Sequence, residues 1–321
     1  MLQVKHLSKS YSSGNQVYPV LRDVSLQVEK GEFVAVMGPS GSGKTTLLNC
    51  ISCFIPHEQG EISLAGHDIS HLKETELAKV RNRQMGFVFQ DFMLLDGLSI
   101  FENICLPQII AHRPVLQMEE KAKNICRLFG IEKIMDKYPA EVSGGEKQRT
   151  AVARALMNQP YVILADEPTG NLDSKSCKAV IDAFLQAKKE MGATIFMVTH
   201  DSFAASFCDR VVVLKDGQIY GELTRSGTRR EFMDELLDTI RTLSDEEPLS
   251  GKDADGRNMG SKEFPGKDAD GRNMGSKEFL GKDADGRNMD SKGFPGKDAD
   301  ERNTDDGRSA RALGGDSDDN E

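Results

Sequence analysis

The segment from Phe33 to Thr45 reads FVAVMGPSGSGKT. Its first part, Phe33 to Met37, is a continuous apolar run, which is typical of a strand buried on both faces of a parallel sheet. The part from Gly38 to Thr45 fits the pattern GxxxxGK followed by Ser or Thr, and it stands between this strand and a helical segment, the context that the pattern requires. The sequence therefore predicts a phosphate-binding turn inside an α/β fold.

This turn can hold a nucleoside triphosphate. Its small residues let successive backbone N–H groups point at the β- and γ-phosphates, and the following helix adds its positive end. Lys44 supplies a mobile charge, and Thr45 offers a hydroxyl group to Mg²⁺. The alternative, a glycine-rich turn with a chance Lys-Thr pair, does not account for the complete pattern in this context. The predicted nucleotide contacts are Gly38, Pro39, Ser40, Gly41, Ser42, Gly43, Lys44, Thr45 and Thr46.

Two further apolar runs, Tyr161 to Ala165 and Thr194 to Val198, also read as buried parallel strands. Asp166 and Glu167 follow the first of them, and His200 closely follows the second. Because ligands of open α/β sheets bind beyond the carboxyl ends of the strands, we expect these residues and the phosphate-binding turn to share one site.

The two carboxylates can take different parts in phosphate chemistry. Asp166 can hold Mg²⁺ through water, and Glu167 can polarise the attacking water, although adjacent carboxylates could also form a solvated strand end. A second helix begins after Ser143, Gly144 and Gly145. Taken alone, this segment reads as an ordinary glycine-containing cap. It becomes a second anion-binding helix start if two copies meet and each offers it to the other's γ-phosphate.

Other parts of the chain predict how the fold surrounds the site. Alternating residues from Leu2 to Val28 around a turn at Ser12 to Asn15 indicate an antiparallel hairpin. Helical periodicity between Asp91 and Leu156 indicates an inserted helical subdomain, with a strand at Gln218 to Leu223 and a helix at Arg229 to Leu243 further on. The predicted fold is an α/β P-loop NTPase (RecA-like) core with an antiparallel β subdomain and an inserted α-helical subdomain.

Composition excludes several classes of protein. A net charge of −10 argues against a nucleic-acid-binding protein, which needs a basic face. No apolar stretch approaches the roughly 18 to 20 residues of a membrane span, and the start of the chain lacks a signal-peptide core, so we expect a cytosolic location. The six cysteines are expected to be reduced. Cys50 and Cys53 should lie one turn apart on the helix after the phosphate-binding turn, in core packing rather than in a redox or zinc site.

The end of the chain has a different character. From Gly251 a 15-residue unit, GKDADGRNMGSKEFP, recurs with changes and then decays in a fourth copy. Its few apolar residues cannot offset chain entropy, so we expect disorder. A calcium loop beginning at Asp253 fails, because Arg257 and Phe264 stand where ligands belong. The predicted domains are an ATPase domain at 1–243, with its helical subdomain at about 91–156, and a low-complexity tail at 244–321.

Together these motifs resemble the ATPase subunit of ABC transporters over about the first 225 residues. The resemblance implies that VSGGEKQ, residues 142–148, is the family signature, with Val142 in place of the usual Leu. It also implies that Tyr11 stacks on adenine, that Gln90 senses Mg²⁺ and couples to a membrane partner, and that His200 contacts the γ-phosphate. Asn171 to Asp173 would form the dimer-interface loop, with Asp173 near the nucleotide. Taken singly, Tyr11 could be a surface aromatic residue, Gln90 a strand-end polar residue and His200 a structural histidine.

Within the family, three segments are similar to the group that serves lipoprotein release, macrolide export and antimicrobial-peptide resistance, and most of all to bacitracin-type exporters. They are LADEPTGNLDS (164–174), GFVFQDFMLL (86–95) and ENICLP (102–107). The resemblance implies ATP and Mg²⁺ as cofactors, a homodimer around two ATP molecules, and a separate permease that holds the subunit at the inner face of the cell membrane. The alternatives are a non-transport ABC protein of translation or DNA repair and a regulatory module whose tail recruits partners.

Overall fold

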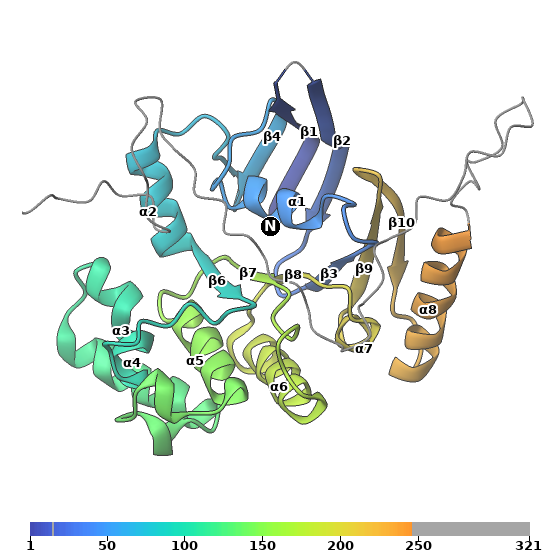
Figure 1. Cartoon of the computed structure of the whole chain (residues 1–321). Coiled ribbons are helices and arrows are strands. Elements are labelled where there is room, and N and C mark those ends of the chain that lie inside the picture. The colour runs from blue at the N-terminus through green and yellow to red at the C-terminus, as the bar shows by residue number, and fades with distance from the viewer. Residues whose placement is uncertain (15, 246–321) are drawn as a thin grey trace, which may run out of the picture. The chain divides into compact units, whose positions relative to one another are not determined.

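An antiparallel sheet forms the first part of the structure. The computed structural model describes residues 1–14 and 16–245. Strands β1 (Leu2–Ser13) and β2 (Gln16–Val28) pair from Leu2 opposite Val28 to Ser13 opposite Gln16. With β4 (Gln59–Leu64) and β5 (His67–Asp68) they form a four-stranded sheet in the order β2-β1-β4-β5 (Figure 1). The predicted antiparallel hairpin is confirmed.

A second, six-stranded sheet carries the chemistry-bearing segments. Its order is β10-β9-β3-β8-β7-β6, and all neighbouring pairs are parallel except β9 and β10. The predicted apolar strands are its inner members: β3 (Phe33–Met37), β7 (Val162–Asp166) and β8 (Ile195–Val198). They are flanked by β6 (Met85–Phe89), β9 (Arg210–Lys215) and β10 (Gln218–Thr224). The carboxyl ends of β3, β8 and β7 therefore lie side by side.

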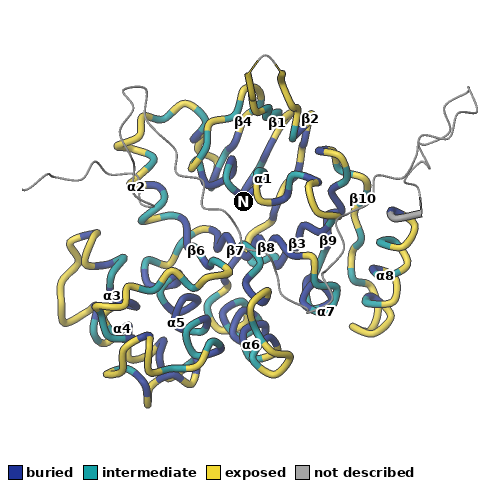
Figure 2. Tube along the Cα trace, viewed as in Figure 1, coloured by how far each residue is buried: buried dark blue, intermediate teal, exposed yellow. Residues whose placement is uncertain are grey.

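Both faces of this sheet are buried. Val34 and Val36 of β3 join one core cluster with Leu47 of α1 (Lys44–Ile51) and with strands of the antiparallel sheet. Phe33 and Ala35 join a second cluster beneath the helices on the other face. Figure 2 shows the inner strands as buried along their length. Because side chains alternate between two covered faces, the strands are apolar at every position and not only at every second one.

Helices cover the sheet and form an insertion between β6 and β7, as the sequence predicts (Figure 1). The insertion comprises α3 (Ile100–Ile110), α4 (Val115–Leu128), the 3₁₀ turns η1 (Glu132–Ile134) and η2 (Pro139–Glu141), and α5 (Gly144–Leu156). The other helices are α2 (Glu74–Gln84), α6 (Ser174–Met191), α7 (Ser202–Ala205) and α8 (Arg229–Asp245). The helix predicted at Arg229 to Leu243 is α8.

The prediction for the two neighbouring cysteines is only half right. Cys50 lies on α1 and is buried, but α1 ends at Ile51, and Cys53 follows the helix in a left-handed conformation with φ 55°. The two thiols are therefore not one turn apart on a helix. Both are free, and burial raises the pKa of Cys50 to about 12 and that of Cys53 to about 11, as expected of packed and unreactive thiols.

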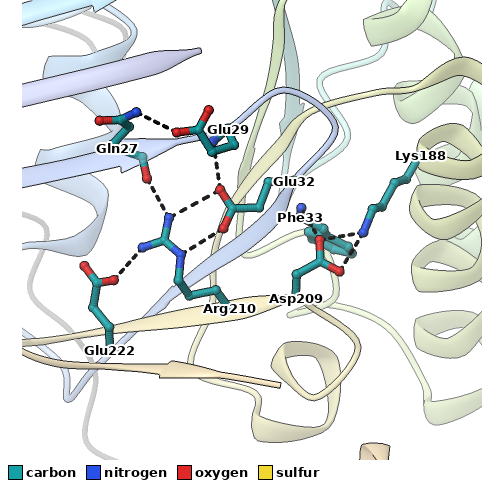
Figure 3. Close-up of polar contacts among 8 residues, drawn as sticks. All are labelled: Gln27, Glu29, Glu32, Phe33, Lys188, Asp209, Arg210 and Glu222. Carbon is teal, nitrogen blue, oxygen red and sulfur yellow. Dashed lines mark hydrogen bonds and ion pairs between the residues drawn. The ribbon is translucent and has the colours of Figure 1, made fainter. Parts of the chain in front are cut away.

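A charged network joins the start of β3 to β9, β10 and α6 (Figure 3). The guanidinium group of Arg210 pairs with Glu32 (Nε to Oε1, 2.8 Å) and with Glu222 (Nη1 to Oε2, 2.7 Å). Next to it, Asp209 accepts a hydrogen bond from the Lys188 ammonium group at 2.6 Å. These pairs fix the amino ends of strands whose carboxyl ends form the site described below.

Within residues 1–14 and 16–245, no helix combines the length and the apolar character needed to cross a bilayer. The repeats that begin at Gly251, and with them the expectation of disorder, lie outside the described residues.

Candidate nucleotide site

The turn after β3 is built from backbone that only glycine can form. A Cβ atom on Gly38 would lie 2.0 Å from the carbonyl oxygen of Leu214 on β9. Gly43 has φ 102°, and a Cβ there would lie 2.9 Å from the carbonyl oxygen of Val20 on β2. The turn is thus pressed against two strands, and its glycines allow both the close approach and the left-handed backbone.

Lys44, the first residue of α1, turns back over this loop. Its Nζ atom donates hydrogen bonds to the carbonyl oxygens of Gly38 at 2.9 Å and Pro39 at 2.8 Å. Burial lowers the pKa of the Lys44 ammonium group, while the nearby carboxylates of Glu167 and Asp166 oppose that shift. A partly desolvated cation is thereby held next to the turn. An anionic ligand bound there would stabilise the charged form of Lys44.

Two features of the turn fit a phosphate group. The hydroxyl oxygen of Ser42 is buried and has no hydrogen-bond partner among the described residues. The N-cap residue of α1 is Gly43, which has no side chain to satisfy the first backbone N–H groups of the helix. Free N–H groups at a helix start are a ready anion site, and an orphaned hydroxyl group beside them is a further donor. The predicted contact residues Ser40, Gly41, Thr45 and Thr46 belong to the same turn and helix start.

Asp166, the last residue of β7, lies next to this helix start. The Oγ1 atom of Thr45 donates to Oδ1 of Asp166 at 3.4 Å. Burial raises the pKa of the Asp166 carboxyl group, and the neighbouring Glu167 raises it further. A hydroxyl oxygen and a carboxylate oxygen at this distance form the oxygen-donor set that Mg²⁺ prefers, so the residues fit a metal ion bound with a triphosphate.

Glu167 and His200 meet across the ends of β7 and β8. The Nδ1 atom of His200 lies 2.6 Å from Oε2 of Glu167. Glu167 has φ 47°, a left-handed conformation that costs free energy in a non-glycine residue. Its backbone N–H donates a hydrogen bond to the carbonyl oxygen of Val198 at 2.9 Å. This backbone turns the carboxylate toward the histidine. The predicted convergence of the strand ends is therefore confirmed.

Gln90 follows β6 at the neighbouring edge of the site. Its Nε2 atom donates to Oδ1 of Asn171 at 3.0 Å, and Nδ2 of Asn171 donates to Oδ1 of Asp91 at 2.9 Å. Within the described residues no hydrogen bond joins Gln90 to Thr45 or Asp166. The structure places Gln90 beside the predicted interface loop, and its expected contact with Mg²⁺ stays a prediction.

Ser143 caps the helix of the predicted signature. Its backbone N–H donates to the Glu146 carboxylate at 2.8 Å, and its hydroxyl group donates to the same oxygen at 2.7 Å. This is a capping box, so within one copy of the chain Ser143 caps α5. Gly145 is buried, and a Cβ there would lie 2.9 Å from the Ser176 hydroxyl oxygen. The contact of Ser143, Gly144 and Gly145 with the nucleotide of a second copy stays a prediction.

Two predicted residues have other contacts within the chain. Tyr11 is 44% exposed on β1, opposite Tyr18, and the Lys9 ammonium group lies 5.3 Å from its ring centroid. Asp173 is the N-cap of α6, where it accepts backbone hydrogen bonds at 3.0 Å from Lys175 and Ser176. An exposed ring suits stacking. A carboxylate at a helix start suits capping, which is the role that the described contacts give to Asp173.

Two residues near Gln90 were not identified from the sequence as parts of the site's framework. Gln148 lies in the signature without a separate role, and Arg154 belongs to an otherwise apolar run, Ala151 to Leu156. The side chains of both donate to backbone carbonyl groups around Gln90. For Arg154 the sequence does contain a signal, because an arginine within an apolar helical run needs a partner for its charge.

Comparisons with known proteins place this geometry in a family. The ABC transporter family matches residues 21–170. The ABC transporter ATP-binding protein YxdL of Bacillus subtilis is 48% identical over 243 residues, which cover 76% of this chain and 94% of that protein. The bacitracin export ATP-binding protein BceA of Halalkalibacterium halodurans is 45% identical over 244 residues, which cover 76% of this chain and 96% of that protein.

A solved structure has the same fold. It is the dimeric ATP-binding cassette MJ0796 of Methanocaldococcus jannaschii in a post-hydrolysis state bound to ADP and Pi. It is 38% identical in sequence and superposes with a TM-score of 0.65, covering 71% of this chain and 100% of that one. The likeness confirms the predicted fold class.

Proposed function

The chain belongs to the ABC transporter family as an ATP-binding and ATP-hydrolysing subunit, and from this premise we propose that it drives a separate permease that exports antimicrobial peptides. The observation that carries the ATPase part of this proposal is the joint geometry of Lys44, Asp166, Glu167 and His200 at adjacent strand ends. The relatives supply the direction of transport, because the 45% identical protein is a bacitracin export ATP-binding protein.

The roles of the site residues follow from their chemistry. The backbone N–H groups of Ser40 to Thr46 and the Lys44 ammonium group bind the β- and γ-phosphates, Gly38 and Pro39 complete the turn, and Tyr11 stacks on the adenine. Thr45, Asp166 and Gln90 hold Mg²⁺. When bound, this ion neutralises the negative charge on the phosphate oxygens. Glu167 accepts a proton from the attacking water, and His200 orients the Glu167 carboxylate and contacts the γ-phosphate.

Two copies of the chain complete the site. Each copy offers the helix start at Ser143, Gly144 and Gly145, together with Asp173 of the interface loop, to the nucleotide held by the other. The cassette MJ0796, which resembles this chain, is a dimer in the structure bound to ADP and Pi. Gly144 has no side chain to keep an anion away from this helix start, and within the chain an added Cβ would also lie 3.1 Å from the Leu172 side chain.

The permease contact lies on the loop after Gln90. Met93 and Leu95 are 56% and 50% exposed, and they are apolar residues only a few positions from the glutamine. A cytoplasmic segment of the permease that packs on Met93 and Leu95 would move together with this loop. We place the subunit at the inner face of the cell membrane through this contact, with residues 1–243 as the ATPase domain and 244–321 as a tail with no assigned role.

Co-purification tests the proposal. The full chain is purified from membranes in mild detergent, the accompanying integral protein is identified, and the complex is reconstituted in vesicles with MgATP. We expect bacitracin to raise the ATP turnover of the complex. Glu167→Gln should lower turnover by about 10² to 10⁴-fold while ATP binding persists. Glu120→Gln, an exposed carboxylate on α4, is the matched control and should leave turnover unchanged.

Three results would contradict the proposal in different places. Absence of an integral partner would remove the permease, and turnover indifferent to the peptide would remove the cargo. Glu167→Gln turnover equal to that of the wild type would remove the catalytic assignment.

A further inference from the structure

The loop that carries Gln90 has a strained backbone. After β6 ends at Phe89, Phe92 and Met93 both adopt left-handed conformations, with φ 62° and 48°. Non-glycine residues adopt this conformation at a cost in free energy and keep it only where surrounding contacts impose it. Within the loop, the Phe92 N–H donates to the carbonyl oxygen of Phe89 at 3.2 Å. The Met93 N–H donates to the carbonyl oxygen of Asp91 at 2.6 Å, and further contacts come from outside the loop.

Arg154 of α5 supplies contacts at these two residues. Its Nη2 atom donates to the carbonyl oxygen of Phe92 at 2.9 Å, and its Nη1 atom donates to that of Met93. Burial lowers the pKa of the guanidinium group to about 10, so it remains charged at neutral pH. In the described part of the chain, no carboxylate pairs with it. Burying a charge without an ionic partner costs free energy. Because the described partners of the Arg154 guanidinium group are carbonyl groups of the loop, we interpret the residue as one that holds the loop.

Gln148 of α5 holds the backbone on the other side of Gln90. It is fully buried, and its Nε2 atom donates to the carbonyl oxygens of Phe89 at 3.0 Å and Pro168 at 2.7 Å. Both acceptors are carbonyl oxygens, so the amide nitrogen must face them. Phe89 precedes Gln90, and Pro168 follows Glu167. One side chain therefore spaces the backbones of the two residues proposed to act on the metal and on the water.

Both donors stand on the helix that begins after Ser143. Helix α5 packs against β6, beside α3 and α6 (Figure 1). The approach is close because Gly86 of β6 has no side chain, and a Cβ there would lie 2.6 Å from the carbonyl oxygen of Ala155. The Gln90 loop and the signature helix are thus tied together on both sides of Gln90.

We propose that Gln148 and Arg154 are positioning residues that fix the Gln90 loop to α5, so that Gln90 and the helix start at Ser143 move as one unit. The inference rests on the proposed function, because it uses the proposed roles of Gln90 and Ser143. Neither side chain needs to touch the nucleotide. Removing either should therefore impair hydrolysis through Gln90 and leave ATP binding in the phosphate loop intact.

The test is a double-mutant cycle in the full chain with MgATP. Arg154→Met and Gln148→Met, which remove the donors at similar side-chain length, are each measured alone and together with Gln90→Ala. We expect each single variant to lower kcat about 10- to 100-fold, the scale of a misplaced catalytic group, with KM for ATP nearly unchanged. In the Gln90→Ala background, Arg154→Met should change kcat less than about twofold, because the group it acts through is gone. Gln148→Met should cost less there than it does alone, because only its contact beside Glu167 remains.

Two comparisons separate positioning from stability. Arg154→Lys keeps a cationic donor and should recover part of the lost kcat. Arg127→Met on α4, whose partners Asn124 and Glu132 lie on the helical insertion, should match the wild type. Thermal unfolding shows which variants fold, and Gln148→Met decides the matter if Arg154→Met does not fold.

Losses that multiply equally in both backgrounds would overturn the inference, and so would normal turnover in Gln90→Ala. A wild-type chain that fails to hydrolyse ATP in its permease complex would instead overturn the proposed function.

Discussion

The carboxylate of Asp166 is held in a place that disfavours its charge. Burial and the adjacent Glu167 raise its pKa above the ordinary value. The folded chain therefore binds a proton at this carboxyl group more readily than the unfolded chain does. The stability gained from this proton is fully present below the pKa that Asp166 has in the unfolded chain. It is lost as pH rises through the pKa in the folded chain. Above the folded pKa, without ligand, the ionised carboxylate destabilises the fold, and a metal ion would relieve that cost.

Asp166→Asn should accordingly make the ligand-free protein more stable at pH 7. The amide keeps an oxygen that can accept from Thr45, and it removes the buried charge. Thermal unfolding of the variant and the wild type, measured from pH 7 down to pH 4 without nucleotide or Mg²⁺, checks the sign. The difference in Tm should favour the variant and shrink as pH falls. A variant less stable than the wild type at pH 7 would show that the carboxylate stabilises the site without metal.

Burial disfavours the charge of Lys44 as well, and a bound phosphate group would be a further counterion for its ammonium group. Lys44→Ala should weaken ATP binding about 10- to 100-fold, which corresponds to the loss of roughly 1.5 to 3 kcal/mol from hydrogen bonds to a charged group. Equilibrium titration with a fluorescent ATP analogue measures this, with Lys123→Ala on the exposed face of α4 as the control. An unchanged affinity for the analogue in Lys44→Ala would contradict the assignment of the phosphate loop.

At the scale of elements, the contact between β6 and α5 depends on one missing side chain. Gly86→Ala would place a methyl group 2.6 Å from the backbone oxygen of Ala155, where nothing flexible can yield. We expect a loss of about 1 to 3 kcal/mol in the free energy of unfolding, the usual cost of overpacking. Gly97→Ala is the control, because nothing lies within 4 Å of its added Cβ. Equal stability of the two variants in urea would show that α5 moves away from β6 freely.

The strands differ in how clearly the sequence indicates them, and Gly86 of β6 shows one reason. The strands β3 and β7 are apolar at each buried position, so their sequences alone indicate them. In β6 the same signal is interrupted by a glycine whose reason, the approach of α5, is tertiary. Strand β9, with Val211 to Leu214 buried, carries as clear a signal as β3 and was predictable. Cys53 was misplaced because the end of α1 at Ile51 has no sequence mark such as glycine.

The candidate site divides in the same way. The phosphate-loop glycines, Asp166 and Glu167 follow from local patterns, since they stand at or soon after the carboxyl end of a buried strand. The contacts of Arg154 and Gln148 with the Gln90 loop join residues about 60 positions apart, so no local pattern contains them. The pairing of His200 with Glu167 likewise depends on β7 and β8 being neighbours in the sheet.

At the scale of the described molecule, the two core clusters lie on opposite faces of the parallel sheet. Neither includes a residue after Leu243. The last helix, α8, belongs to the second cluster through Phe232, Leu236 and Leu243. Its Arg229 side chain also lies over the Phe207 ring, 4.6 Å from the centroid. The helix is therefore part of the folded unit, although it lies beyond the region that matches the family.

Two truncations test where the folded unit ends. A chain that stops after residue 250 keeps every described core residue, so its Tm and ATP turnover should equal those of the full chain. A chain that stops after residue 228 loses the three buried side chains of α8, worth roughly 4.5 to 9 kcal/mol at ~1.5 to 3 kcal/mol each. Because a domain is stable by only about 5 to 15 kcal/mol, the shorter chain should unfold at a much lower temperature or fail to fold. If the chain ending at residue 250 also lost stability or turnover, the segment after residue 250 would have to contribute to the ATPase, and the division at 243 would be wrong.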